Sequence, residues 1–228
     1  MEDDTFIKNV EFEPLNNSKY LTPIRMIFEA RLKKNDKVRK IIWDVATEHD
    51  SVATLLYNKD HDTLLFVKQF RASVFFGAVK RQKENLGKTI ENIDFTKYPT
   101  SLGYSLELCA GLIDKPGVSV LKHAHEEILE ECGYDVPLEE IKLLKRFITG
   151  IGFSGAQQHI FYAIVDDSMI VHEGGGIEED GENIETISMT INEVKNLMNQ
   201  DELCSPPGFL FAVQYFLDKI YSKIKKNT

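Results

Sequence analysis

The spacing of hydrophobic and polar residues predicts a protein built from many short strands and a few helices. Residues 51–57 and 63–70 are apolar runs rich in strand-forming residues, and the polar stretch 58–62 between them favours a turn, so together they predict a hairpin. The same reasoning predicts further strands at 25–31, 40–44, 104–109, 141–149, 158–165 and 184–190. Asn35-Asp36, between the first two of these, has the chemistry of a turn.

Two segments have helical periodicity. Residues 119–132 predict a helix that ends at Gly133, because at about 100° per residue one arc holds Leu121, Ala124, Ile128, Leu129 and Cys132. Thr190 and Glu193 have the spacing of a capping box, which predicts a short helix after the last strand. A final helix is predicted after Pro206-Pro207, with one apolar face formed by Leu210, Val213, Leu217, Ile220 and Ile224.

Strands mixed with two or three helices indicate an α+β fold or a mixed-sheet α/β/α sandwich. The 228 residues, 43% of them hydrophobic, suffice for one large domain or for one domain with a small extra layer. Residues 1–50 form a separate set of short segments, and residues 80–100 are polar enough to predict a long excursion from the domain.

Composition narrows the possible partners. The net charge of −9 argues against non-specific nucleic-acid binding, which requires a positive surface, although an acidic protein can bind an anion when metal ions supply the positive charge. No apolar run approaches the roughly 20 residues of a membrane span, and the N-terminus lacks the pattern of a secretory signal. The three cysteines, an odd number without CxxC spacing, favour a reducing compartment. We therefore expect a cytoplasmic protein with neither a nucleic-acid nor a membrane partner.

The predicted helix at 119–132 carries an unusual group of carboxylates. Glu127 and Glu131 are four residues apart at the edge of the apolar arc, Glu130 lies beside them, and Glu126 points furthest outward. Like charges at this spacing destabilise a helix by roughly 0.2–0.5 kcal/mol per pair, and near the helix C-terminus the dipole also disfavours them. A hard cation would reverse both penalties. Taken alone, however, Glu-Glu-x-x-Glu-Glu is more often a solvated acidic face.

The context of these glutamates resembles the Nudix box, in which a glycine is followed by a helix bearing Arg-Glu-apolar-x-Glu-Glu-x-Gly. Gly111, Glu127, Glu130 and Glu131 match the pattern. Three features depart from it: one extra residue follows Gly111, Val118 occupies the first glutamate position, and Glu126 occupies the arginine position. Further motifs in the same order at 49–52, 67–71, 107–117, 147–155 and 174–182 extend the resemblance over about residues 20–220.

These motifs are similar to those of the Nudix branch that cleaves nucleoside diphosphate sugars and ADP-ribose. The resemblance implies a Nudix α/β/α sandwich with a mixed sheet at residues 49–228, and a small N-terminal β layer at residues 1–48. It also implies a homodimer in which the N-terminal layer packs across the two-fold axis. Trp43, within that layer, is expected to belong to a core or an interface rather than to a base-stacking platform.

The resemblance also implies a Mg²⁺ site, with Mn²⁺ as a possible substitute. The expected ligands are Glu127, Glu130, Glu131, the carbonyl of Ala110 and a loop glutamate, Glu182, while waters and substrate phosphates complete about six oxygens. His123, four residues before Glu127, makes a Zn²⁺ site conceivable, but without a second well-spaced partner we expect His123 and His125 to be exposed helix residues.

Catalysis is expected to involve the acidic loop at 171–183. By resemblance Glu182 is the first candidate for the general base, with Glu179 and Glu131 as further catalytic candidates. Glu178 and Asp180 are close rivals. The alternative is an acidic loop in which any single residue has no role.

Substrate contacts are expected from Arg71, Gly111 and Ser154. A guanidinium suits a phosphate, although Arg71 could instead form a surface ion pair. Gly111 would let the loop approach the diphosphate, and both Gly111 and Gly117 could equally be turn residues. Ser154 and Gln157 are candidates for the sugar, and Glu107 is expected to be structural.

The expected activity is Mg²⁺-dependent hydrolysis of a nucleoside diphosphate sugar, UDP-glucose giving UMP and glucose 1-phosphate. The alternatives are hydrolysis of ADP-ribose by the same chemistry, or a catalytically weak binding module of the same fold, which Val118 and Glu126 favour. A calcium-binding protein is excluded because no Asp-x-Asp-x-Asp-Gly loop occurs.

Overall fold

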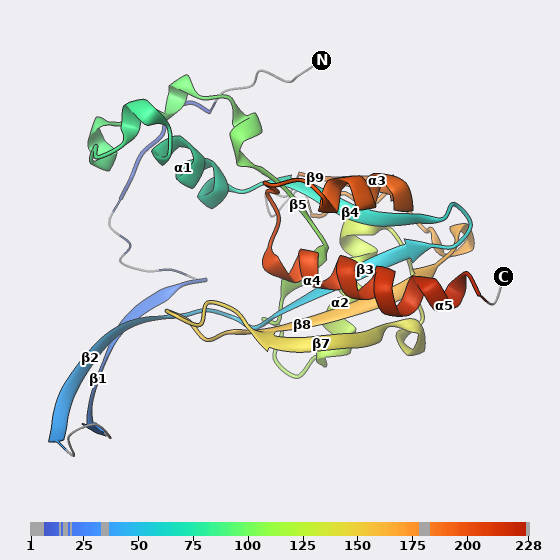
Figure 1. Cartoon of the computed structure of the whole chain (residues 1–228), viewed down its shortest axis with the longest axis horizontal. Helices are drawn as coiled ribbons and strands as arrows, with labels where there is room; N and C mark the ends of the chain where they lie inside the picture. The colour runs from blue at the N-terminus through green and yellow to red at the C-terminus, as the bar shows by residue number, and fades with distance from the viewer. Residues whose placement is uncertain are drawn as a thin grey trace.

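The computed structural model describes residues 7–13, 15, 18, 20–32, 37–177 and 183–226 (Figure 1). The strands are β1 (Thr22–Leu32), β2 (Lys37–Thr47), β3 (Ser51–Asn58), β4 (Thr63–Phe70), β5 (Tyr104–Glu107), β6 (Cys109–Leu112), β7 (Lys142–Ile148), β8 (Gln157–Val165) and β9 (Ile184–Thr190). The helices are α1 (Ala72–Lys80), α2 (Val120–Cys132), α3 (Ile191–Met198), α4 (Pro207–Tyr215) and α5 (Ser222–Ile224). None of them is long and apolar enough to cross a membrane, as far as the described residues go.

A seven-stranded mixed sheet forms the centre of the protein. Its main path is β5-β4-β3-β8-β7, with β6 paired to the first half of β3 and β9 paired to β4. Only the β3–β8 pair is parallel; the other described pairs of this sheet are antiparallel. The predicted hairpin is confirmed as β3 and β4, which begin and end within a residue of the expected bounds.

Alternation along the strands divides the core into two layers. Val52 and Leu56 of β3 pack with Ile128 of α2 on one face of the sheet. Residues on the opposite face of the same strand, such as Leu55, pack with helices α3 and α4, for example with Phe209. Because successive side chains of a strand point to opposite faces, one strand serves both layers. The predicted α/β/α sandwich is therefore confirmed.

Helix α2 has the bounds that its sequence predicts. The Ser119 side chain accepts a hydrogen bond from the backbone N–H of Lys122, which satisfies one of the unpaired donors of the first turn. The helix ends at Gly133. Ala124, Ile128 and Cys132 are buried under the sheet, as the periodicity indicates.

The last helix confirms its predicted start and most of its predicted face. α4 begins at Pro207, Val213 is buried, and Leu217, Ile220 and Ile224 pack against the same core. Leu210 is the exception, because it is 39% exposed. A π-helical segment, Phe216–Tyr221, joins α4 to α5. The buried arc of α4 is formed by Phe209, Ala212, Val213 and Phe216, so Leu210 lies at its edge.

The excursion after β4 contains structure that the sequence analysis missed. Helix α1 was not predicted, and the predicted polar excursion at 80–100 consists of short 3-10 turns. These turns enclose a small core formed by Phe75, Val79, Ile93 and Phe95. Phe12, from the N-terminal segment, adds its ring to this core, with its centroid 5.1 Å from that of Phe95.

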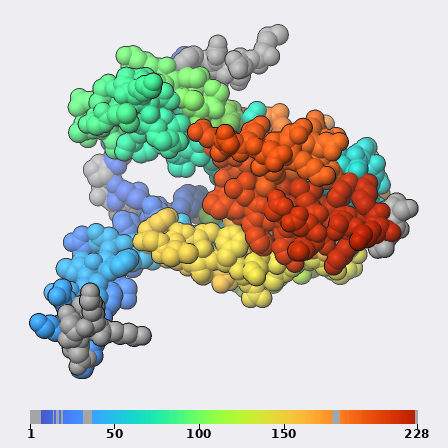
Figure 2. All heavy atoms as spheres, in the orientation of Figure 1, coloured from blue at the N-terminus to red at the C-terminus, as the bar shows by residue number. Residues whose placement is uncertain are grey.

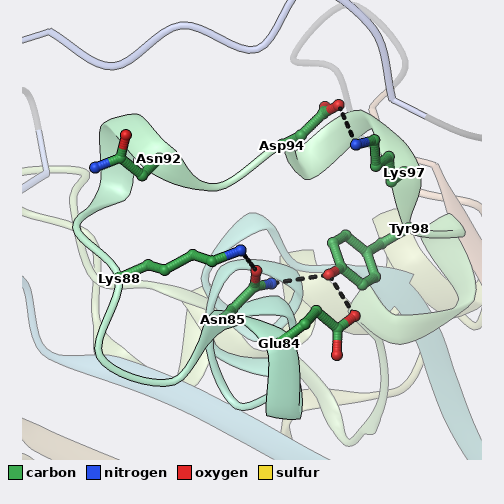
Figure 3. A pocket seen from close by; sticks show the side chains of 7 residues that line it. All are labelled: Glu84, Asn85, Lys88, Asn92, Asp94, Lys97 and Tyr98. Carbon is green, nitrogen blue, oxygen red and sulfur yellow. Dashed lines mark hydrogen bonds and ion pairs between the residues drawn. The ribbon is translucent and has the colours of Figure 1, made fainter.

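A hollow of about 280 Å³ within the excursion is lined by polar side chains that bond to one another (Figure 3). Its lining is formed by Glu84, Asn85, Lys88, Asn92, Asp94, Lys97 and Tyr98. The Tyr98 hydroxyl donates to Glu84 at 2.7 Å and accepts from the Asn85 amide at 2.9 Å, and the Lys88 ammonium reaches Asn85. These contacts link the two ends of the excursion, which indicates a structural role.

Strands β1 and β2 form a separate two-stranded ribbon, called the arm below, which projects from the body (Figure 1). In the space-filling view the arm and the excursion extend from the same end of the body with an opening between them (Figure 2). The arm is fixed at its base, where the N–H of Ala46 donates to the carbonyl of Phe153 at 2.8 Å.

The two faces of the arm differ in polarity. One face is charged and holds the Arg25–Asp44 ion pair. The other face is apolar: the register pairs Met26 with Trp43, and their exposed fractions are 54% and 56%. Ile24, Phe28, Ile41 and Val45 lie on the same apolar face by strand alternation.

Candidate functional site

A pocket of about 730 Å³ lies at the edge of the sheet where β6 meets α2. Its lining is formed by Tyr20, Ser51, Gln69, Phe70, Arg71, Glu107, Ala110, Gly111, Leu112, Asp114, Lys115, Glu127, Glu130, Glu131, Gln158, Ile177 and Asn183. The pocket therefore brings together six predicted site residues that are up to 60 positions apart in sequence: Arg71, Ala110, Gly111, Glu127, Glu130 and Glu131. The volume suits a ligand the size of a small cofactor.

Glu127 lies directly against the backbone of β6 at Gly111. A β-carbon at this position would overlap the Glu127 carboxylate, so any larger residue would displace that side chain. The glycine is thus required here by a close approach, in addition to any turn chemistry. It leaves a cradle for the carboxylate at the floor of the pocket.

Glu131 is held at the same strand. Its Oε2 accepts a hydrogen bond of 2.8 Å from the backbone N–H of Ala110, and the side chain is only 3% exposed. A buried carboxylate is stable only when hydrogen-bonded or paired, so this contact fixes its position. Glu130, one residue earlier, is partly exposed at the pocket wall.

The glycine-rich segment 174–176 covers the C-terminal end of α2. The N–H of Gly175 donates to the carbonyl of Glu131 at 2.9 Å, and the N–H of Gly176 donates to the carbonyl of Glu130 at 3.1 Å. These bonds satisfy carbonyls that a helix end leaves unpaired. A β-carbon at Gly174 would overlap the Glu131 carbonyl, which explains the glycine there.

The acidic loop that follows is closed at its base. The N–H of Ile184 donates to the carbonyl of Gly175 at 3.2 Å, and both Ile177 and Asn183 line the pocket. The predicted Glu182 and Glu179, together with Glu178 and Asp180, lie outside the described residues. The two described flanks of this loop nevertheless border the same pocket as Glu127 and Glu131.

Within the part of the chain that the structure describes, no three His, Cys, Asp or Glu side chains are gathered closely enough to hold a metal ion by themselves. The oxygen donors present still fit a hard cation. Glu127 and Glu131 approach adjacent residues of β6, and the cradle at Gly111 exposes backbone beside them. An ion here would need further oxygens from backbone, water or substrate.

Arg71 forms a two-pronged contact with Glu107. Its Nε and Nη2 donate to the two carboxylate oxygens, each at 2.9 Å, and the Ser105 hydroxyl also bonds to Glu107. Burial alone would raise the pKa of Glu107, but the hydrogen bonds and charge of Arg71 outweigh it and lower that pKa. Arg71 thus lines the pocket and is anchored by a buried carboxylate.

The two helix histidines are not exposed, contrary to the expectation from sequence. His123 is 1% exposed: its Nδ1 lies 3.0 Å from the Ser119 carbonyl, and its Nε2 accepts from the N–H of Lys115 at 3.3 Å. The His125 side chain is 12% exposed and contacts Asp135. The loop 113–118 folds over the first turn of α2, and periodicity alone does not show this.

Ser154 and Gln157 do not line the pocket. The Ser154 hydroxyl bonds to Glu48 at the base of the arm, and the N–H of Gln157 donates to Asp50 at 2.8 Å. The neighbouring Gln158 lines the pocket instead. Strand alternation along β8 could have distinguished these two glutamines, because Gln157 and Gln158 point to opposite faces of the sheet and only one of them can face the pocket. Trp43 is exposed on the arm and is not among the residues that line the pocket.

Several pocket residues were missed by the sequence analysis, notably Tyr20, Phe70, Asp114, Lys115 and Asn183. Phe70 lies within the motif at 67–71, and Asp114 and Lys115 lie within the motif at 107–117, so their positions in the chain carried a signal. Tyr20 comes from the segment before the arm, and no local pattern marks it.

A mixed-sheet sandwich whose glutamate-bearing helix packs its carboxylates against a glycine loop is the architecture of the Nudix class. No family model matches the chain. It is 32% identical to the uridine diphosphate glucose pyrophosphatase of Mus musculus over 209 residues, which is 90% of this chain and 91% of that protein. It is 30% identical to the protein of the same name from Bos taurus, over 87% of this chain and 89% of the relative.

More distant similarity extends to a bacterial relative. The GDP-mannose pyrophosphatase of Pectobacterium atrosepticum is 27% identical over 179 residues, or 78% of each chain. The extent and identity of the first two matches show the relationship plainly: this chain belongs to the Nudix hydrolases, in the group that includes the nucleotide-sugar pyrophosphatases.

Proposed function

We propose that this protein hydrolyses the diphosphate of a nucleoside diphosphate sugar, with UDP-glucose as substrate and UMP and glucose 1-phosphate as products. The observation that carries the proposal is the arrangement of Glu127 and Glu131 against Ala110–Gly111 in a pocket large enough for such a substrate. The names of the relatives in Mus musculus and Bos taurus support the choice of UDP-glucose.

The donor set supports Mg²⁺ as the cofactor, with Mn²⁺ as a substitute. Glu127, Glu130, Glu131 and the carbonyl of Ala110 would hold it, with Glu182 added by the resemblance. A bound Mg²⁺ would neutralise phosphate charge and lower the pKa of a coordinated water. Without it, the carboxylates that line this pocket would repel a diphosphate.

The chain's own residues orient both the cation site and the substrate. Ala110 fixes Glu131, and Gly111 leaves space for Glu127, so neither carboxylate has to be reordered when the substrate binds. Arg71, held by Glu107, places a guanidinium at the pocket wall for a phosphate oxygen.

For the carboxylate that deprotonates the attacking water we propose Glu182, with Glu179 as the neighbouring candidate. Support comes from the base of their loop, which is bonded to α2 through Gly175 and bordered by pocket residues on both sides. Glu131 is the weaker candidate for this role, because the N–H of Ala110 already occupies one of its oxygens.

We further propose that the protein is a homodimer joined through the apolar face of the arm. A two-stranded ribbon is at best marginally stable alone in water, and exposed apolar patches commonly mark protein interfaces. The face that carries Met26 and Trp43 meets both descriptions. Residues 1–48 as a dimerisation layer, separate from residues 49–228, remain a prediction.

The test is product analysis with UDP-glucose, GDP-mannose and ADP-ribose, each in Mg²⁺ and in excess chelator. The proposal expects metal-dependent release of UMP and glucose 1-phosphate, at a higher kcat/KM than for the other two substrates. Preference for ADP-ribose would retain the chemistry and reject the substrate. No turnover of any of the three would favour a catalytically weak binding module.

A further inference from the structure

The charges that line the pocket pose a problem for an anionic substrate. Five lining residues are acidic (Glu107, Asp114, Glu127, Glu130 and Glu131), and two are basic (Arg71 and Lys115). A diphosphate in this pocket should meet each available cation. The two basic residues differ in how the protein holds them, and, given the proposed function, this difference assigns them different roles toward the substrate.

Arg71 is committed to a buried partner. Two of its guanidinium nitrogens donate to Glu107, whose side chain is 10% exposed. Moving Arg71 onto a substrate would leave a buried carboxylate without its cation, which is costly. A phosphate in the pocket would therefore meet the Arg71 guanidinium in a fixed position.

Lys115 has a fixed backbone and a side chain that can move. Its N–H donates to the buried His123, which anchors the loop on the first turn of α2. Its ammonium lies 2.8 Å from Oε2 of Glu126, and the two side chains are 50% and 25% exposed. The Glu126 carboxylate raises the pKa of Lys115, and the charges of Glu130 and Glu127 add to this, so the ammonium stays charged.

Glu126 is not among the residues that line the pocket, so Lys115 reaches outward from the pocket to its partner. Ion pairs that are this exposed contribute little to stability, and exchanging one anion for another costs correspondingly little. The four-carbon stem of lysine gives the ammonium the reach and freedom to make the exchange.

We propose that Lys115 is a substrate-positioning residue whose ammonium leaves Glu126 and binds a phosphate oxygen of the nucleoside diphosphate sugar. Glu126 keeps the ammonium at the pocket wall while the pocket is empty. Lys115 acts on binding rather than on the chemical step, since its contact forms with the ground-state phosphate.

The test compares Lys115→Met with Lys122→Met, which removes the same charge from a residue of α2 that contacts His125 and does not line the pocket. Two readouts are measured: KM and kcat for UDP-glucose, and the calorimetric Kd of uridine 5′-(α,β-methylene)diphosphate, whose carbon bridge cannot be hydrolysed. We expect Lys115→Met to raise both KM and Kd about tenfold, with kcat within about twofold, as for a lost charge-assisted hydrogen bond. Lys122→Met should change neither by more than about twofold, and Lys115→Arg should retain most of the affinity.

Thermal unfolding of each variant verifies that the fold is intact, and Glu126→Gln tests the exchange itself. Releasing Lys115 from Glu126 should leave Kd unchanged or lower it. A tenfold rise in Kd for Glu126→Gln would overturn the proposal, because the intact Lys115–Glu126 ion pair, and not the released ammonium, would then be needed for binding. Unchanged KM and Kd in Lys115→Met would also overturn it. So would a Lys115→Met variant in which Kd is constant but kcat falls and a higher Mg²⁺ concentration is required for turnover. Failure of the proposed function is distinguishable, because the wild-type protein would then not turn over UDP-glucose.

Discussion

Helix α2 and the arm each carry an apolar stripe, and the protein treats the two in opposite ways. On α2, Ala124 and Ile128 are fully buried under the sheet. On the arm, Met26 and Trp43 are each more than half exposed. Burying a side chain the size of Ile128 or Met26 contributes about 1.5–3 kcal/mol, so α2 has gained this free energy within one chain and the arm has not.

The difference distinguishes contacts that a single chain forms by itself from an apolar surface that a single chain leaves exposed. The carboxylates of α2 are positioned by residues of the same chain: Ala110 binds Glu131, and Gly111 accommodates Glu127. The arm is anchored at Ala46, but Met26 and Trp43 of its apolar face remain more than half exposed. We therefore expect substitutions on α2 to act on one chain, and substitutions on the arm to act on the assembly.

The largest effect should come from Glu127→Gln. The amide keeps the size of the side chain and its place against Gly111 but removes the charge that binds a cation. Since a metal ion supplies several kcal/mol of transition-state stabilisation, turnover of UDP-glucose should fall by about 1000-fold or more. Chelation of the wild-type protein should reproduce this loss.

A matched control is Glu140→Gln, an exposed carboxylate in a turn outside the pocket, which should leave turnover within about twofold. Thermal unfolding of Glu127→Gln should match the wild type. A near-normal rate in Glu127→Gln would remove the metal site from the proposal, whereas unfolding would make the rate uninformative and require Glu130→Gln instead.

The next effect sharpens the comparison of the two stripes. Ile128→Ala should lower the free energy of unfolding by about 2–5 kcal/mol, because it leaves a cavity between α2 and the sheet. Urea denaturation at a protein concentration low enough to separate the subunits should show a change of at most about 0.5 kcal/mol for Trp43→Ala. Equal losses at that concentration would mean that Trp43 packs within its own chain.

The arm itself is tested with Trp43→Asp, which places a charge on the apolar face. If that face joins two protomers, each dimer would bury two unpaired carboxylates, and the dissociation constant should rise by about 100-fold or more. Ile42→Asp is the control, since Ile42 has the same exposed fraction of 56% and lies on the opposite face of the same strand. Sedimentation should give a monomer for Trp43→Asp only; a dimer in both variants would place the interface elsewhere.

The same contrast explains how much the sequence could predict. Helix α2 and strands β3, β4 and β9 were predicted well because their caps, turns and periodicity are local. Helix α1 was missed because its residues are almost uniformly apolar around Gly77, and its packing depends on Phe12, more than 60 positions away. Leu210 was placed on the buried face of the last helix but lies at its edge, because the buried arc is formed by Phe209, Ala212, Val213 and Phe216.

The residues of the candidate site likewise fall into two groups, those marked by local sequence spacing and those that only the tertiary structure brings together. The glutamates and Gly111 could be identified because their spacing on one helix and one loop is readable from the chain. The contacts of Lys115 and the burial of His123 could not be identified, since both depend on a loop that folds back over α2. Tyr20 joins the pocket from a segment with no motif, which only the tertiary arrangement shows.

The smallest effect concerns the Arg71–Glu107 pair and its dependence on pH. The pKa of Glu107 is lowered in the folded protein, so the pair contributes stability above the unfolded pKa of about 4.3, and that stability is lost as pH falls through the lower folded value. In Arg71→Met, burial of Glu107 dominates and raises its pKa, so Glu107 should destabilise the fold at neutral pH and become less unfavourable as pH falls. We expect a loss of about 1.5 kcal/mol at pH 7, held to that size because the Arg71 side chain is 43% exposed and water screens the pair.

Urea denaturation at pH 7 and near pH 4 measures the free energy of unfolding and its dependence on pH. Lys68→Met, which breaks the exposed Lys68–Glu185 contact, is the control and should change neither quantity. An unchanged pH dependence in Arg71→Met would show that Ser105, and not the guanidinium, holds Glu107 in its charged form.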